Sequence, residues 1–300
     1  MLKFVAIDVG SNAMRLVLTH VFEGETGPSF KRETLLRVPV RLGEDVFTLG
    51  HISEYKAHQL LKAMQAFRHL IDVFEPHAYM ACATSAMRDA PNGPDLIAEI
   101  QELADISLQI IQGGFEAELI FASHVAETLD PQKNYLYIDV GGGSTELTIF
   151  SEGQQAAAES FNIGTVRLLC DQVQPSEWQR MSTWITKHCQ TPGDWQGIGS
   201  GGNINKLYKL SNRKDKAYLK TNHLNYWLGL LEPLSIDQRI EKYVLKPDRA
   251  DVIVPATQIY LRVMQEARLE RIYVPQVGLA DGMIHFLYET WRREHADTRS

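Results

Sequence analysis

The sequence lacks any apolar run that approaches the roughly 20 residues of a membrane-spanning helix. Its first residues lead into a strand-like segment and not into a secretory signal. Cysteine is scarce, and the three that occur (Cys82, Cys170 and Cys189) have no metal-ligand spacing and cannot all pair. These absences favour a cytoplasmic location, no membrane partner and reduced, structural thiols.

The chain also lacks an excess of positive charge. Its 30 Lys and Arg residues against 37 Asp and Glu residues give a net charge of −7, which argues against a broad basic face and against nucleic acid as a partner. An anionic ligand must then be attracted by local groups such as backbone amides and single arginines. The 300 residues, 44% of them hydrophobic, are typical of a soluble globular protein with two domains.

Two halves of the chain repeat one order of predicted elements. In the first half, periodicity predicts strands over 3–7, 15–22, 33–42, 78–83 and 108–111. It predicts helices over 94–103 and 116–129, and a further helix, capped by Ser53, between the third and fourth strands. In the second half it predicts strands over 135–138, 146–150 and 154–161, then a helix over 176–189, a strand over 195–198 and helices from 203, 248 and 278. One repeat per domain is the economical interpretation, so we expect an α/β protein with domains over 1–130 and 131–300 and a ligand cleft between them.

A glycine-rich loop follows the first strand of the second half. It contains Gly141, Gly142 and Gly143, whose successive N–H groups can form an anion-binding nest. The hydroxyls of Ser144 and Thr145 add donors, and the acids at its two ends, Asp139 and Glu146, are candidates to hold a metal ion or a water. A plain hairpin turn is the structural alternative, but two glycines would suffice for that.

The matching loop of the first half has less glycine. Gly10, Ser11 and Asn12 can donate to phosphate oxygens, Arg15 adds a charged donor, and Asp8 stands at the strand end as a further metal candidate. Alone this is an ordinary turn. Its repetition in the second half favours a pair of phosphate-binding loops.

Three further segments carry candidate groups. Thr84, Ser85 and Arg88 follow a buried strand and suit an oxyanion site, although Arg88 can instead pair with its neighbour Asp89. Glu116 lies in a predicted first helical turn, where an acid is favoured by the helix dipole or can activate a water. A loop before another helix is typical of phosphate binding and also of simple packing; its residues are Gly199, Ser200 and Gly201.

The ordered motifs resemble those of the exopolyphosphatase/guanosine pentaphosphate phosphatase (Ppx/GppA) family. They are the loops around Asp8 and Asp139, Ala83–Ala90, the Gly113-x-x-Glu116-Ala segment and Gly199–Gly202, with later blocks at 162–168 and 278–282. The resemblance spans nearly the whole chain. It implies two actin-like (ribonuclease H-like) domains of the acetate and sugar kinase superfamily, with a homodimer as a further expectation.

The resemblance also implies an activity. Family members hydrolyse the terminal phosphate of inorganic polyphosphate or guanosine pentaphosphate, usually with Mg²⁺ or another divalent cation. Glu116 matches the glutamate that positions water, Arg88 the arginine that contacts the transferred phosphate, and Asp139 and Glu146 the acids associated with the metal. Two rivals stay open: a small-molecule kinase of the same superfamily, and a non-catalytic sensor of polyphosphate or guanosine tetraphosphate.

This chain departs from the family pattern at two positions. Phe115 stands where the family usually has a glutamate before the catalytic one, and Ala13 stands where serine is common. Both changes make the predicted site less polar. The length also resembles short members without a C-terminal helical domain, which leaves processive action on long polyphosphate an open question.

Overall fold

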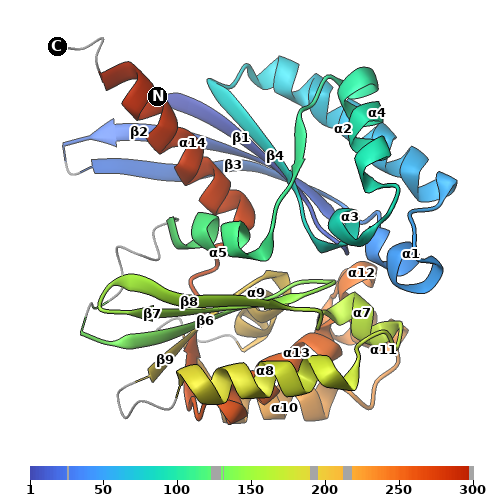
Figure 1. Ribbon diagram of the computed structural model, residues 1–300, viewed down its shortest axis with the longest axis vertical. Helices are drawn as coiled ribbons and strands as arrows, with labels where there is room; N and C mark the ends of the chain where they lie inside the picture. The colour runs from blue at the N-terminus through green and yellow to red at the C-terminus, as the bar shows by residue number, and fades with distance from the viewer. Residues whose placement is uncertain (26, 123–129, 131, 190–194, 212–217, 297–300) are drawn as a thin grey trace. The chain divides into compact units, whose positions relative to one another are not determined.

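The computed structural model describes residues 1–300 apart from 26, 123–129, 131, 190–194, 212–217 and 297–300. The chain divides into two compact units, and each is described here by itself (Figure 1). Unit 1 comprises Met1–His124 and Leu279–Ser300, and unit 2 comprises Val125–Gly278. Within these described ranges, no helix combines the length and hydropathy that crossing a bilayer requires.

Unit 1 is built on a five-stranded sheet with the strand order β3-β2-β1-β4-β5. The hairpin strands β2 and β3 are antiparallel to their neighbours, whereas β1, β4 and β5 run parallel. The elements in chain order are β1 (Leu2–Val9), β2 (Met14–Gly24), β3 (Gly27–Val38), α1 (Leu42–Leu49), α2 (Glu54–Phe74), β4 (Ala78–Ala83), α3 (Ser85–Asp89), α4 (Gly93–Ala104), β5 (Leu108–Ile110), α5 (Gly113–Ala122) and α14 (Leu279–Ala296).

Unit 2 repeats this plan with a six-stranded sheet, in the order β10-β11-β9-β6-β7-β8. The hairpin β6-β7-β8 is antiparallel and β9 runs parallel to β6, as β4 does to β1. The elements are β6 (Asn134–Val140), β7 (Thr145–Ser151), β8 (Gln154–Phe161), α7 (Thr165–Leu169), α8 (Pro175–His188), β9 (Trp195–Ser200), α9 (Gly202–Leu210), β10 (Tyr218–Lys220), α10 (Thr221–Leu231), α11 (Ile236–Tyr243), α12 (Pro247–Ala250), α13 (Ile253–Glu266) and β11 (Arg271–Tyr273).

The C-terminal helix α14 belongs to a different unit from the one that the sequence predicted. The sequence-based division assigned all of 131–300 to the second domain. The helix lies across β1, β2 and β4 and beside α5, so it belongs to unit 1 (Figure 1). Its apolar face explains this place: Met283 and Ile284 are buried, and Tyr288 packs edge-on against Phe4 of β1. A hydrophobic period of 3.6 residues predicts an apolar face on the helix but does not predict which sheet that face covers.

Several local predictions are confirmed and others are not. Ser53 caps α2 by accepting the N–H of Lys56, as predicted. The predicted strand over 33–42 ends at Val38, and α1 begins at Leu42. The single helix predicted from 248 to 269 is broken into α12 and α13. Part of the helix predicted over 116–129 lies outside the described residues.

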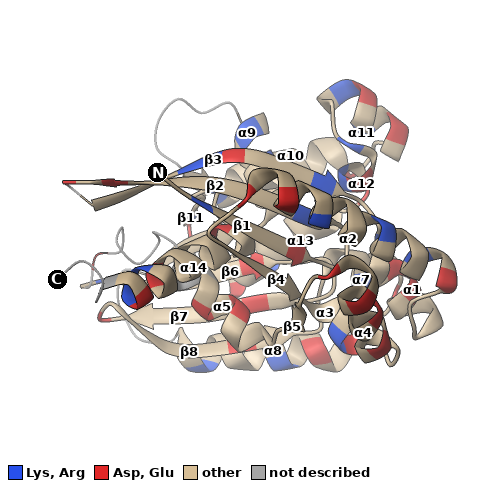
Figure 2. Ribbon diagram, turned by 90° about the horizontal axis from the view of Figure 1, so that it is seen from above, with Lys and Arg blue, Asp and Glu red and all other residues tan. Residues whose placement is uncertain are grey.

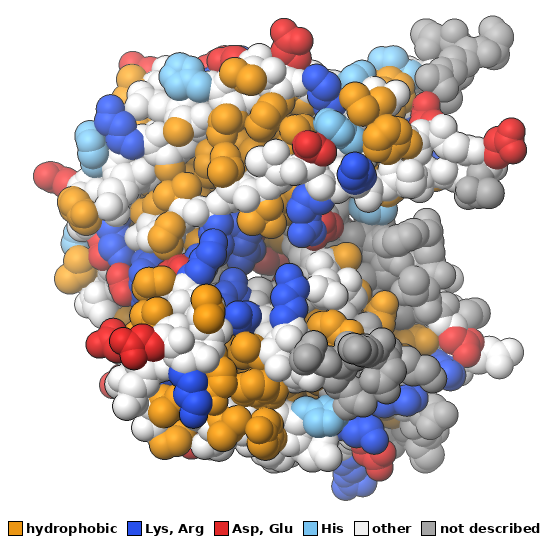
Figure 3. Space-filling model, turned by 180° about the vertical axis from the view of Figure 1, so that it is seen from behind, with side chains coloured by type: hydrophobic (Ala, Val, Ile, Leu, Met, Phe, Trp, Pro, Cys, Tyr) orange, Lys and Arg blue, Asp and Glu red, His pale blue; other side chains and the backbone are white. Residues whose placement is uncertain are grey.

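Charged side chains of both signs are interspersed on the surface. Figure 2 shows Lys, Arg, Asp and Glu on the same helices, for example α11. On the face in Figure 3, hydrophobic side chains lie among charged ones, which is ordinary for a folded chain. This distribution agrees with local, not global, attraction of an anionic ligand.

Candidate active site

In unit 1, a buried carboxylate and an arginine face each other across the first hairpin. Asp8 of β1 is directly opposite Arg15 of β2. Arg15 Nη1 donates to Asp8 Oδ2 at 2.6 Å; the side chain of Asp8 is 4% exposed and that of Arg15 35%. The arginine therefore neutralises an acid that would be costly to bury alone.

The predicted polar groups of unit 1 gather around the first loop. Ser11 Oγ lies 2.8 Å from Ser85 Oγ at the start of α3, and the N–H of Thr84 donates to the Val9 carbonyl. Arg88 Nη1 donates to the Ile111 carbonyl at 3.1 Å, whereas its Nε lies 3.8 Å from Asp89. Arg88 is thus tied mainly to the end of β5 and not to its sequence neighbour.

Glu116 lies in the first turn of α5, as predicted, and is 9% exposed. Its charge, like that of Asp8, acts on the thiol of Cys82 in β4. Burial first, and then the charges of Asp8 and Glu116, raise the pKa of Cys82 to about 12. Unit 1 therefore places Asp8 at the carboxyl end of β1 and Glu116 in the first turn of α5, each close enough to Cys82 for its charge to act on the thiol.

Phe115 precedes Glu116 in α5 and contacts the C-terminal helix. Its ring meets Phe286 of α14 edge-on, with ring centroids 6.2 Å apart and an interplanar angle of 85°. The residue that departs from the family pattern is thus part of the packing between α5 and α14.

In unit 2, the position equivalent to Arg15 holds an acid. Asp139 of β6 is directly opposite Glu146 of β7, and the two are 7% and 3% exposed. Opposed residues of an antiparallel pair share one face of the sheet, so two carboxylates are buried side by side. Glu146 Oε1 accepts hydrogen bonds from Ser144 Oγ at 2.6 Å and from Ser160 Oγ at 2.9 Å.

The glycine loop of unit 2 is held from one side by α7. Its carbonyls at Gly141 and Gly142 accept the N–H groups of Thr165 and Val166 at 3.0 and 2.8 Å, and Gly143 O accepts from Arg167 Nε at 2.8 Å. In a trans peptide the N–H points opposite to the C=O. The amides of residues 142–144 are therefore directed away from α7, as an anion-binding nest requires.

Close approach of α7 to this loop depends on Gly164. A Cβ built there would lie 2.4 Å from the Gly142 carbonyl oxygen, so any larger residue would displace the backbone. Gly164 and Arg167 lie in the block 162–168 of the family resemblance, and the sequence alone indicated no role for either. The sequence feature that could have indicated this contact is a glycine shortly after the third strand of the unit 2 hairpins, β8.

The first loop is held in the same way by α1. Ser11 O accepts the N–H of Gly43 at 2.8 Å, and Asn12 O accepts that of Arg41 at 3.2 Å. A Cβ at Gly43 would lie 2.9 Å from Ser11 Cβ. Each unit thus has a hairpin loop whose carbonyls face a helix and whose amides face the other way.

Three hydroxyls that the sequence predicted to bind phosphate instead donate hydrogen bonds to other groups of unit 2. Ser144 donates to Glu146, Thr145 Oγ1 donates to the Ile163 carbonyl at 2.5 Å, and Ser200 Oγ donates to the Val277 carbonyl at 3.2 Å. Thr145 and Ser200 are completely buried. The backbone amides, and not these hydroxyls, are therefore the donors that the loops offer to a ligand.

The loop Gly199–Gly201 ends β9 beside the paired acids. Gly201 has a φ of 107°, and a Cβ there would lie 3.0 Å from Asp139 Oδ1. Only glycine fits this backbone conformation and this approach without strain.

The paired acids of unit 2 are the best candidates for a divalent cation. In the described part of the chain, no three His, Cys, Asp or Glu side chains form a ligand group. Mg²⁺ in phosphate-processing sites commonly takes one or two carboxylates and completes its shell with water and substrate phosphate. Asp139 and Glu146 fit that pattern, whereas Asp8 is committed to Arg15.

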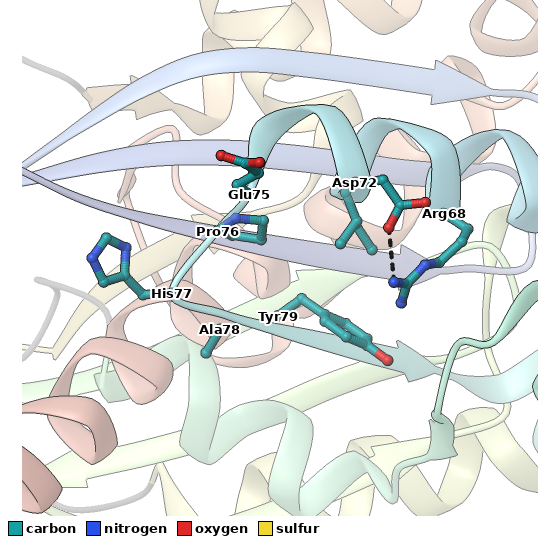
Figure 4. Close-up of a pocket in the computed structure, with 8 residues that line it drawn as sticks. Arg68, Asp72, Glu75, Pro76, His77, Ala78 and Tyr79 are labelled. Atoms are coloured by element: carbon teal, nitrogen blue, oxygen red, sulfur yellow. Dashed lines mark ion pairs between the residues drawn. The ribbon is translucent and has the colours of Figure 1, made fainter.

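A shallow pocket of unit 1 lies at the start of β4, at the opposite end of that strand from Thr84 and Ser85. It is formed where α2 ends and β4 begins, between Arg68 and Tyr79 (Figure 4). Arg68 is held there by Asp72 at 2.7 Å and by Asp105 at 3.3 Å. Parallel sheets bind ligands at the carboxyl ends of their strands, so this pocket is not the candidate site.

Comparison with known proteins agrees with the geometry. The chain is 26% identical over 315 residues to exopolyphosphatase 2 of Mycobacterium tuberculosis, covering 94% of this chain and 97% of that protein. It is 32% identical over 167 residues to a bifunctional 3-dehydroquinate synthase/phosphatase of Fusobacterium nucleatum, covering 54% of this chain and 25% of that protein.

The fold matches a solved structure closely. The crystal structure of an exopolyphosphatase from Cytophaga hutchinsonii has a TM-score of 0.80 at 23% identity and covers 96% of this chain and 98% of that one. This confirms the predicted α/β fold with one sheet in each half of the chain. The sequence pattern of the Ppx/GppA phosphatase family matches residues 34–290, and the chain therefore belongs to the Ppx/GppA phosphatase family.

Proposed function

We propose that this protein releases the terminal phosphate of inorganic polyphosphate by attack of water on phosphorus. The observation that carries the proposal is the pair of hairpin loops whose amides are directed away from α1 and α7, with paired acids beside one of them. Membership of the Ppx/GppA family and the exopolyphosphatase relatives support it.

The candidate groups of each unit, taken separately, suit different parts of this reaction. In unit 1, Glu116 accepts a proton from the attacking water, and Arg88 balances charge on the transferred phosphoryl group. In unit 2, the amides of residues 142–144 hold phosphate oxygens, and Asp139 with Glu146 would hold Mg²⁺. A bound divalent cation would neutralise charge that develops on the phosphate oxygens.

Phosphoryl transfer needs positioning and charge neutralisation more than covalent help. The loops provide this because their carbonyls are already bonded to α1 and α7, so the amides need no reorganisation when the phosphate arrives. Guanosine pentaphosphate presents the same terminal anhydride and is the second substrate to test.

The test is phosphate release from tripolyphosphate, longer polyphosphates and guanosine pentaphosphate, side by side, with Mg²⁺ and without an acceptor. Release from polyphosphate alone supports hydrolysis. Turnover only with an added hydroxyl acceptor would indicate the kinase alternative. Tight binding without release under any divalent cation would indicate a sensor.

A further inference from the structure

Tyr260 is completely buried in the middle of α13 and contacts the candidate site from behind. Its hydroxyl donates to the carbonyl oxygen of Ser200, the last residue of β9. Because the side chain has no access to solvent, it cannot touch a substrate. Any effect it has on the reaction must pass through the residues it contacts.

Three groups meet around this hydroxyl. Ser200 is directly opposite Asp139 in the parallel pairing of β9 with β6. A Cβ built at the next residue, Gly201, would lie 3.0 Å from Asp139 Oδ1 and 3.7 Å from the Tyr260 hydroxyl. The tyrosine, the turn at Gly201 and the carboxylate are therefore packed against one another, and a shift of one displaces the others.

The hydroxyl is a permanent donor. Burial, with a further contribution from Asp139 and Glu146, raises the pKa of Tyr260 well above its ordinary value. The phenol therefore keeps its proton at neutral pH, and the hydroxyl donates to the Ser200 carbonyl. It adds no charge to the paired acids and supplies one fixed hydrogen bond to the loop.

We propose that Tyr260 is a positioning residue that fixes the Ser200–Gly201 turn and, through it, the Asp139 carboxylate in the orientation that binds a divalent cation. The inference rests on the proposed function only for the reaction whose kcat is measured; the predicted change in cation binding does not depend on it. Partners behind a metal ligand that orient it commonly change metal affinity or activity by about 10–100-fold when removed.

The test uses Tyr260→Phe, which keeps the ring and removes only the hydroxyl. Binding of Mn²⁺ alone to the full chain is measured by electron paramagnetic resonance, and kcat and KM are measured with tripolyphosphate and Mg²⁺. We expect the Mn²⁺ dissociation constant to rise and kcat to fall, each by about 10–100-fold. The KM should change little, because the amides of residues 142–144 are held by α7 and not by Tyr260.

Tyr135→Phe is the matched control. Tyr135 is a buried tyrosine of β6 in the same unit, and its hydroxyl accepts the N–H of Asp130 at 2.9 Å. The variant also loses one hydrogen bond between a tyrosine hydroxyl and the backbone, at the opposite end of β6 from Asp139. We expect it to match the wild type in Mn²⁺ binding and kcat even where both variants lose thermal stability.

A second variant is expected to displace the Asp139 carboxylate directly, without removing the Tyr260 hydroxyl. Gly201→Ala places a methyl group against Asp139 Oδ1 at a positive φ, so it should also weaken Mn²⁺ binding. Tyr260→Phe with wild-type Mn²⁺ binding and kcat would overturn the inference, as would equal losses in Tyr135→Phe. If the wild type releases no phosphate from polyphosphate but Tyr260→Phe still weakens Mn²⁺ binding, the inference stands and the proposed function fails.

Discussion

The two hairpin loops share one hydrogen-bonded skeleton but carry opposite charge at one equivalent position. In the first, Gly10 N donates to Ala13 O at 3.1 Å, and in the second, Gly141 N donates to Ser144 O at 2.9 Å. The residue opposite the strand-end aspartate is Arg15 in unit 1 and Glu146 in unit 2. The scaffold is duplicated, while the chemistry of the two copies has diverged.

This difference assigns different roles to the two aspartates. The ion pair with Arg15 leaves Asp8 neutralised within its own unit. Asp139 shares a buried face with a second acid, and two like charges at short range are unfavourable unless a cation or a proton compensates. Under the proposed function, the second loop is therefore the one that would take a divalent cation.

The largest expected effect separates the two aspartates. Asp139→Asn should lower kcat/KM by roughly 10²–10³-fold, the range seen when a group that stabilises transition-state charge is lost, and should raise the Mg²⁺ concentration needed for half-maximal rate. Asp8→Asn should leave that Mg²⁺ requirement near the wild-type value. Mg²⁺ titrations of phosphate release check both. An equal shift in Mg²⁺ requirement for both variants would contradict the division of roles.

A smaller effect is expected from Glu146→Gln, which removes one of the two like charges. The amide oxygen can still accept from Ser144 and Ser160. Without divalent cations the variant should unfold at a higher temperature than the wild type, because repulsion with Asp139 is relieved. With saturating Mg²⁺ the order should reverse, since the wild type gains more from binding. Thermal unfolding in a chelator and in Mg²⁺ measures this, and a less stable variant in the chelator would count against the like-charge account.

The smallest effect compares the two helices that hold the loops. Gly164→Ala places its Cβ against backbone, whereas Gly43→Ala meets side-chain atoms of Ser11 and Phe47 first. Overpacking costs about 1–3 kcal/mol, and we expect Gly164→Ala near the upper end and Gly43→Ala near the lower. Urea denaturation measures the free energy of unfolding of both variants. A larger loss of stability in Gly43→Ala than in Gly164→Ala would contradict this expectation.

The sequence predicted the two hairpins well because their strands and turns depend on local signals. Alternating hydrophobicity defines the strands, and Asp-Gly turns define the loops. It did not predict the partners of the acids at these loops. The Asp8–Arg15 pair and the Asp139–Glu146 pair depend on strand register, which a single sequence constrains weakly.

Other parts of the site could not be read from the sequence because they depend on distant segments. The clamping helices α1 and α7 are short, and α7 has only five residues, too few for a clear period. Tyr260 lies 60 positions from the carbonyl it binds. The place of α14 in unit 1 follows from packing against β1, which no local pattern reveals.

The most direct test of the central claim is phosphate release from tripolyphosphate by the wild type and by Glu116→Gln, with tripolyphosphate binding measured on both. Glu116 is buried in the first turn of α5, and the amide keeps its shape but cannot accept a proton from water. The account predicts that the wild type releases phosphate with Mg²⁺ and that the variant binds tripolyphosphate nearly as tightly but releases almost none. Full turnover by Glu116→Gln, or no release by the wild type, would contradict it.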